Sequence, residues 1–115
     1  MLIQSAPALH LLLDSMDKKQ LRAIGHHLKP VVTVAGAGLS ENVLAELDRA
    51  LNDHELIKVK LAVDDRQARE QVSASICEQL KAEVVQSIGK IILVLRRNSR
   101  ANPKISNLVR YLSDI

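Results

Sequence analysis

The hydrophobic pattern of this chain changes repeatedly between a helical period and a strand period. Apolar residues recur every three or four positions in three segments, and this spacing predicts amphipathic helices. The three segments are residues 17–28, 39–54 and 66–82. Alternation or short β-branched runs in other segments predict strands. The four predicted strands are residues 31–34, 56–63, 84–88 and 91–96.

This order of elements predicts the fold class. Along the chain it is α-β-α-β-α-β-β, which predicts an α/β two-layer sandwich with a mixed four-stranded sheet. Only Gly89 and Lys90 separate the last two strands, so we expect these strands to form an antiparallel hairpin. The 115 residues suffice for one domain with a modest core. We expect an N-terminal extension over residues 1–15, the folded domain over 16–97, and a basic linker with a short helical tail over 98–115.

A glycine-containing loop lies between the first predicted strand and the second predicted helix. Gly36 and Gly38 flank Ala37 there, and we expect the helix to open at these glycines. The unbonded amides of a helix's first turn and the positive end of its dipole suit a phosphate group. A pair of glycines before a helix is also typical of a plain tight turn, so the pattern alone leaves both interpretations open.

The basic residues are concentrated in the second half of the chain. Sixteen Lys and Arg against thirteen Asp and Glu give a net charge of +3. Residues 1–57 sum to −2, whereas residues 58–115 sum to +5, and no carboxylate occurs in the run 89–106. Such a run favours a polyanionic partner over a solvated surface. Lys58 and Lys60 alternate along one predicted strand, a pattern that is also typical of a protected edge strand.

The composition argues against several functional classes. With no Phe or Trp and a single Tyr, the chain lacks the aromatic residues on which many RNA-binding sheets stack bases. The single cysteine, Cys77, cannot form an intramolecular disulfide, so we expect a buried structural thiol in a reducing compartment. No segment approaches the length of a membrane span. We therefore expect a cytoplasmic protein that is not bound to a membrane.

No residue pattern predicts catalysis, a cofactor or a metal site. His26 and His27 are consecutive, so their side chains diverge on a helix and are not expected to chelate one ion. Glu41 occupies the place of the third glycine in a dinucleotide fingerprint, where its charge would oppose a pyrophosphate. Asp64 and Asp65 precede a predicted helix and are typical of caps. We expect a protein that is not an enzyme, with no cofactor, no metal and no catalytic residue.

Four ordered motifs together form a specific family pattern. They are HxLKPVV at His26–Val32, GLSENVLAEL at Gly38–Leu47, HELIKVK at His54–Lys60 and IGKIILVLRR at Ile88–Arg97. With these motifs the chain resembles the CRM domain (chloroplast RNA splicing and ribosome maturation), specifically the stand-alone bacterial members of the YhbY type. The resemblance implies a fold similar to the C-terminal domain of bacterial initiation factor three, RNA binding, and association with precursor large ribosomal subunits.

The resemblance also implies a GxxG loop similar to the clamp of KH domains, in which backbone amides hold a few nucleotides. The second glycine of that pattern falls on Gly38, whereas the first falls on Ala35, so the chain departs from the pattern there. The loop carries no Lys or Arg of its own, and RNA binding would depend more on neighbouring basic side chains.

Residues and resemblance together predict a monomeric, non-catalytic RNA-binding protein. We expect it to bind ribosomal precursor RNA during assembly of the large subunit, through the glycine loop and a basic face. The expected RNA-binding residues are Arg22, Lys29, Gly36, Ala37, Gly38, Lys58, Lys60, Lys90, Arg96 and Arg97. An alternative is a protein-interaction module whose basic face docks an acidic ribosomal protein or assembly factor.

Overall fold

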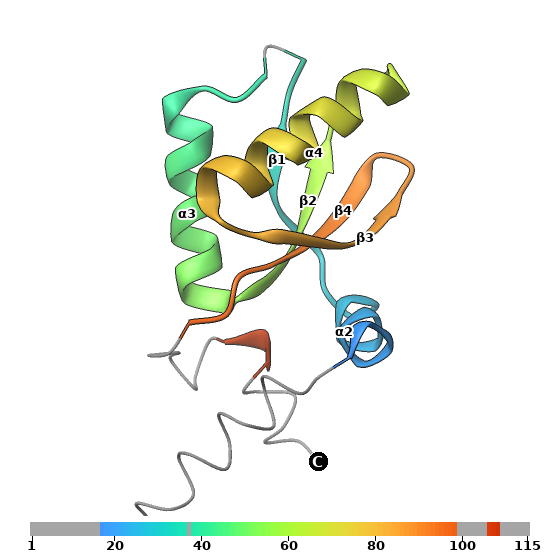
Figure 1. Ribbon diagram of the computed structural model, residues 1–115, viewed down its shortest axis with the longest axis vertical. Helices are drawn as coiled ribbons and strands as arrows, with labels where there is room; N and C mark the ends of the chain where they lie inside the picture. Colours follow the sequence, from blue (N-terminus) through green and yellow to red (C-terminus); the bar gives the residue numbers. More distant parts are fainter. Residues whose placement is uncertain (1–16, 37, 99–105, 109–115) are drawn as a thin grey trace, which may run out of the picture.

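The computed structural model describes residues 17–36, 38–98 and 106–108. This part of the chain contains three helices and four strands in the predicted order (Figure 1). They are α2 (Lys18–Gly25), β1 (Pro30–Val34), α3 (Glu41–His54), β2 (Leu56–Leu61), α4 (Arg66–Leu80), β3 (Glu83–Ile88) and β4 (Ile91–Leu95). The α/β fold class is therefore confirmed. The expected N-terminal extension and most of the expected C-terminal tail lie outside the described residues.

The four strands form one mixed sheet in the order β1-β2-β4-β3. β1 runs parallel to β2, whereas β4 runs antiparallel to both β2 and β3. The predicted hairpin is confirmed, because Gly89 and Lys90 alone join β3 to β4 and Gly89 has a positive φ of 57°. β2 lies in the interior of the sheet, so the edge-strand interpretation of Lys58 and Lys60 does not apply.

The two faces of the sheet are covered unequally. α3 and α4 pack on one face, over the larger of two hydrophobic cores. α2 packs on the opposite face and covers it at one end, the lower end in Figure 1. We call this second face the α2 face; on β2 it carries the side chains of Leu56, Lys58 and Lys60. The predicted two-layer arrangement holds for α3, α4 and the sheet, and α2 adds a partial third layer.

Local sequence explains where α2 starts and ends. Asp17 and Gln20 form a capping box: the Asp17 carboxylate accepts the N–H of Gln20, and the Gln20 side chain accepts the N–H of Asp17. The helix ends at Gly25, three residues before the predicted end. The amides of His27 and Leu28 donate three residues back, to Ile24 and Gly25, so the chain tightens into turns before Pro30.

Gly25 allows α2 to lie close to the sheet. A Cβ at this position would come within 2.6 Å of Cδ2 of Leu93 in β4. Leu93 is only 2% exposed and packs with Leu21 and Ile24 of α2, so it has little room to move aside. The contact between Gly25 and Leu93 therefore sets the distance between α2 and the sheet.

A buried carboxylate attaches the C-terminal part of the described chain to the domain. Glu55 is 1% exposed and has a φ of 63° where α3 ends. Its carboxylate accepts the N–H of Asn98 at 2.8 Å and the hydroxyl of Ser106 at 2.6 Å. Leu108, two residues further on, is fully buried beside α2. Residues 106–108 consequently pack as part of the core on the α2 face.

Candidate nucleic-acid interface

A groove of about 300 Å³ lies between α2 and the α2 face of the sheet. Its lining residues come from α2 and its C-cap, β2, β3 and β4. They are Arg22, His26, Lys58, Gln86, Ile88, Ile91 and Leu93. No carboxylate occurs among the described residues that line it. The groove therefore places basic side chains beside an aliphatic surface with no opposing charge in its wall.

Strand alternation and register bring the two lysines of β2 to this side of the sheet. Ile57 and Val59 point into the core under α3 and α4, so Lys58 and Lys60, which alternate with them, point to the α2 face. Lys58 is half-buried in the groove, and Lys60 is exposed. Pro30 of β1 pairs with Lys58. The exposed Lys29 precedes Pro30 and therefore lies alongside the start of β2.

The glycine loop lies at the opposite end of the sheet from α2. It follows Val34 at the end of β1, and Thr33 pairs with Lys60. In Figure 1 the loop is at the upper end of the view and α2 is at the lower end. The predicted residues of α2 and of the glycine loop thus lie at opposite ends of the sheet, and Lys58 and Lys60 lie between them.

The loop itself is a turn in which one amide is already used. Gly38 has a φ of 92°, and its N–H donates to the carbonyl of Ala35 at 3.0 Å. Ala35 is not among the described residues with positive φ, so alanine is tolerated at the position of the family's first loop glycine. Ala37 lies outside the described residues. A phosphate at this turn would meet the amide of Gly38 only after the bond to Ala35 opened.

The start of α3 also differs from the predicted phosphate site. The helix begins at Glu41 rather than at the glycines, and that expectation was wrong. The hydroxyl of Ser40 accepts the N–H of Val43 at 3.2 Å, and the side chain of Glu41 lies in the first turn. The cap uses one first-turn amide, and the acid complements the helix dipole. This helix start is therefore less suited to an anion than the sequence predicted.

Lys90, in the β3–β4 hairpin, is paired with an acid. Its Nζ lies 2.6 Å from Oδ1 of Asp64. This hydrogen bond and the charge of Lys90 lower the pKa of the Asp64 carboxyl below its usual 3.8. Of the two acids expected to cap α4, Asp65 does so by accepting the N–H of Ala68 at 3.1 Å. Asp64 instead connects the α4 cap region to the hairpin.

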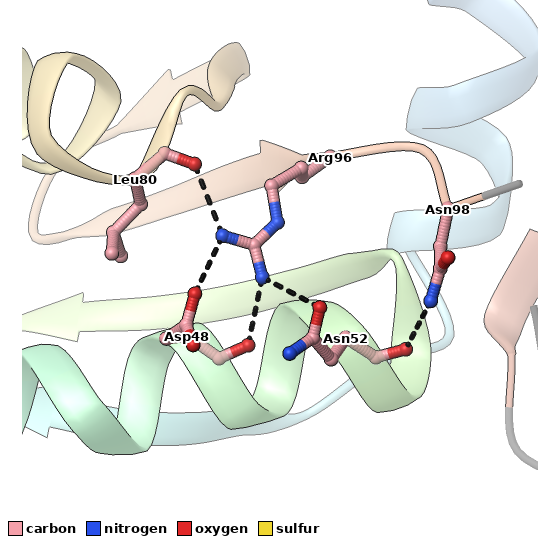
Figure 2. A network of polar contacts seen from close by, with 5 residues as sticks. All are labelled: Asp48, Asn52, Leu80, Arg96 and Asn98. Atoms are coloured by element: carbon pink, nitrogen blue, oxygen red, sulfur yellow. Dashed lines mark hydrogen bonds and ion pairs between the residues drawn. The ribbon is translucent and has the colours of Figure 1, made fainter. Parts of the chain in front are cut away.

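Arg96 is held inside the molecule, between α3 and the end of α4 (Figure 2). Its side chain is 18% exposed. Nη1 donates to Oδ1 of Asp48 at 2.8 Å and to the carbonyl of Leu80 at 3.0 Å. Nη2 donates to the carbonyl of Asp48 at 2.9 Å and to Oδ1 of Asn52 at 3.0 Å. These four bonds give Arg96 a structural role, and the geometry does not support the expected RNA contact.

The structure thus sorts the ten expected RNA-binding residues by location. The residues on or beside the α2 face are Arg22, Lys29, Lys58 and Lys60. The residues of the distant loop are Gly36 and Gly38. Those close to acids are Lys90 and Arg97, the latter with Nη1 at 4.0 Å from Oε1 of Glu83. Of the remaining two, Arg96 is bonded between α3 and α4, and Ala37 lies outside the described residues.

Two polar residues that line the groove, His26 and Gln86, were not selected from the sequence. His26 follows Arg22 by four positions, a spacing that puts both residues on one side of a helix. The sequence therefore contained a pattern from which His26 could have been selected. Gln86 had no such signal, because the register of β3 shifts between Val84 and Gln86. A bulge of this kind breaks the simple alternation of sides along a strand.

Other chemistry is limited within the described residues. No group of His, Cys, Asp and Glu among them could hold a metal ion. Cys77 is only partly buried, and not fully buried as expected. This partial burial raises the pKa of its thiol, which keeps the sulfur protonated near neutral pH. None of the described helices has the length and apolar content needed to cross a membrane.

The fold and the groove together define a small α/β domain with a basic groove next to a helix, and the described residues that line this groove include no carboxylate. Comparison with known families identifies the domain: the model of the CRS1/YhbY (CRM) domain matches residues 13–96. The chain belongs to this family, as the sequence motifs predicted.

Similar proteins and a similar structure agree with this assignment. A probable RNA-binding protein of Pseudomonas aeruginosa is 54% identical over 99 residues, which cover 86% of this chain and 95% of that protein. An RNA-binding protein of Haemophilus influenzae is 45% identical over 89 residues, covering 77% and 90%. The solution structure of a hypothetical protein from Staphylococcus aureus, a candidate RNA-binding protein, matches with a TM-score of 0.66 and 28% identity, covering 77% and 92%.

Proposed function

We propose that this chain is a non-catalytic RNA-binding protein whose α2 face contacts the ribose-phosphate backbone. The observation that carries the proposal is the groove in which Arg22, His26 and Lys58 converge with no carboxylate in the described lining. Phosphate contacts by Lys and Arg supply most of the affinity in sequence-independent binding of nucleic acids. The names of the relatives in Pseudomonas and Haemophilus support the same function.

The glycine loop extends the proposed surface along the sheet. A backbone that crosses the α2 face past Lys58 and Lys60 reaches the turn at Gly36 and Gly38. The small residues of the loop allow close approach, because no heavy atom of the other described residues, the chain neighbours aside, lies within 4 Å of where a Cβ would stand at either glycine. The loop contributes to this proposal as an auxiliary contact, and the lysines of β2 are the principal one.

Charge reversal on the α2 face tests RNA binding. Affinity for a fluorescent structured RNA is measured by anisotropy at several salt concentrations. We expect Lys60→Glu to weaken binding at least tenfold. We also expect the slope of the logarithm of the binding constant against the logarithm of salt concentration to become shallower by about 0.7 to 0.9, the contribution of roughly one phosphate contact.

Arg66→Glu is the matched control, because it changes the charge equally at an exposed position of α4. We expect this variant to retain affinity within about twofold, since distant surface charges are largely screened at physiological salt. Equal losses in both variants would mean that overall charge, and not the α2 face, governs binding. Unchanged affinity in Lys60→Glu would refute the proposed surface.

We further propose that the RNA is ribosomal precursor RNA and that the chain acts during assembly of the large subunit. This rests on family membership, because the resemblance to the family implies association with precursor large ribosomal subunits. Co-sedimentation of the full chain with precursor large-subunit particles tests it, with Lys60→Glu as the comparison. Loss of co-sedimentation after nuclease digestion is expected. Association that survives with free ribosomal proteins would instead support docking to an acidic protein.

A further inference from the structure

We infer that the groove between α2 and the sheet accepts one unpaired nucleotide of the bound RNA, with its base against Ile88 and Ile91 and its edge at Gln86. The inference rests on the proposed RNA-binding function and adds the kind of RNA that is preferred. It predicts a requirement for a loop, bulge or single-stranded end, which backbone contacts alone do not impose.

The groove has an apolar floor that no other described segment covers. Ile88 is 64% exposed, which is unusual for a large aliphatic side chain, and it pairs directly with Ile91 across the hairpin. Both side chains therefore lie side by side on the α2 face. A flat base laid on them would remove apolar surface from water on both partners. This aliphatic pair can replace the aromatic platform that the described strands lack.

The charges around this floor match a nucleotide. Arg22 on α2, His26 at the C-cap of α2 and Lys58 on β2 form the basic part of the lining, where the phosphates on either side of a base would lie. A volume of about 300 Å³ suits a single base and its sugar and is too small for a helix of RNA or protein. A duplex keeps its bases stacked inside, so it would cover the isoleucines with charged backbone and gain nothing from them.

Gln86 is placed to contact the edge of such a base. The bulge in β3 puts it opposite Leu93, on the α2 face beside the isoleucine pair. A glutamine amide offers one donor group and one acceptor group, and it can therefore pair with the edge of an exposed base. Arg22 adds a planar guanidinium, a group on which unstacked bases also lie.

Two RNAs with the same stem distinguish this inference from general backbone binding. One has an unpaired loop and the other is a blunt duplex, and both are titrated with the full chain. We expect the loop RNA to bind more tightly. We expect Ile88→Ser to weaken binding to the loop RNA about fivefold, because it removes apolar surface on which the base would lie, while affinity for the duplex stays within twofold.

Val31→Ser is the matched control, because Val31 is also an exposed aliphatic residue, at 52%, and lies outside this groove. It should leave both affinities unchanged. Gln86→Leu should reduce differences in affinity among loops that carry A, C, G or U at the unpaired position. Photocrosslinking from a 4-thiouridine in the loop to the wild-type chain provides a readout independent of any variant, and we expect the crosslink within residues 86–93.

The outcomes separate the two proposals. The nucleotide groove is refuted if both RNAs bind equally, if Ile88→Ser affects them alike, and if the crosslink maps outside residues 86–93. Backbone binding would still stand in that case. If neither RNA binds, or Lys60→Glu has no effect on either, the proposed function itself fails. Preferential capture of an acidic peptide over the loop RNA would assign the groove to a protein partner and would also refute the inference.

Discussion

The guanidinium of Arg96 binds the carboxylate of Asp48 across a distance of 2.8 Å and so joins the chain after β4 to the middle of α3. The same guanidinium donates to the carbonyl of Leu80, the last residue of α4 (Figure 2). One side chain thus connects both helices of the larger layer to the sheet. The Lys and Arg content of a segment does not by itself show whether its charges face a partner or the protein.

We predict that Arg96→Met lowers the free energy of unfolding by about 2 to 4 kcal/mol, the usual range when one partner of a largely buried charged network is removed. Urea denaturation followed by circular dichroism measures it. Lys60→Met, at an exposed position, should change stability by less than about 0.5 kcal/mol. A stable Arg96→Met protein that has lost RNA affinity would instead show that Arg96 acts at the interface.

The buried carboxylate of Glu55 should be coupled energetically to Ser106, whose hydroxyl donates to it at 2.6 Å. Glu55→Gln replaces a charged acceptor by a neutral one, and we expect it to destabilise the domain by about 1.5 to 3 kcal/mol. In a double-mutant cycle with Ser106→Ala, residues in direct contact should show a coupling energy of about 0.5 to 3 kcal/mol. Simple additivity would mean that residues 106–108 are not held by this bond in solution.

The pair formed by Asp64 and Lys90 should give the hairpin a dependence on acid pH. The pKa of Asp64 is lowered in the folded chain, so its contribution to stability is present above the pKa of the unfolded state and is lost as the pH falls through the folded value. We expect an NMR titration of the carboxyl carbon to show a pKa below 3.8. Lys90→Gln should raise that pKa, and an unchanged value would rule out the ion pair.

Replacing Gly25 by alanine should destabilise the domain, although alanine is the better helix former. The added methyl group would stand 2.6 Å from Cδ2 of the buried Leu93. Overpacking of this kind typically costs about 1 to 3 kcal/mol, more than the gain in helix propensity at a last turn. Leu93→Ala in the same chain should recover part of the loss, measured against Leu93→Ala alone. A more stable single variant would show that α2 is not seated on this contact.

Much of the fold could be predicted because the period of the hydrophobic pattern is a direct record of which sides are buried. The alternation from Leu56 onward placed Ile57 and Val59 on one side of the strand and the two lysines on the other. The two-residue connection of Gly89 and Lys90 indicated a hairpin. Helix ends were less predictable. α2 ends where His27 and Leu28 form turns, and α3 starts after the Ser40 cap. At each end, one more or one fewer helical residue makes a small difference, so the sequence pattern does not fix the boundary.

The candidate site could be predicted only in part, because a sequence shows charge and spacing but not pairing. Lys58 and Lys60 were placed correctly on one face by alternation. Nothing in the order of residues indicated that Arg96 would meet Asp48, which lies 48 positions earlier. Gln86 was hidden by the bulge in β3, since an extra residue after Val84 reverses the expected side of the residues that follow it.

The interior position of β2 limits which sequence changes the α2 face can accept in evolution. Its backbone is hydrogen-bonded to β1 on one side and to β4 on the other, so a one-residue insertion would turn Ile57 and Val59 outward and bury the lysines. Lineages can therefore exchange one amino acid for another at Lys58 and Lys60, but insertions and deletions in this strand would destroy the fold together with the surface.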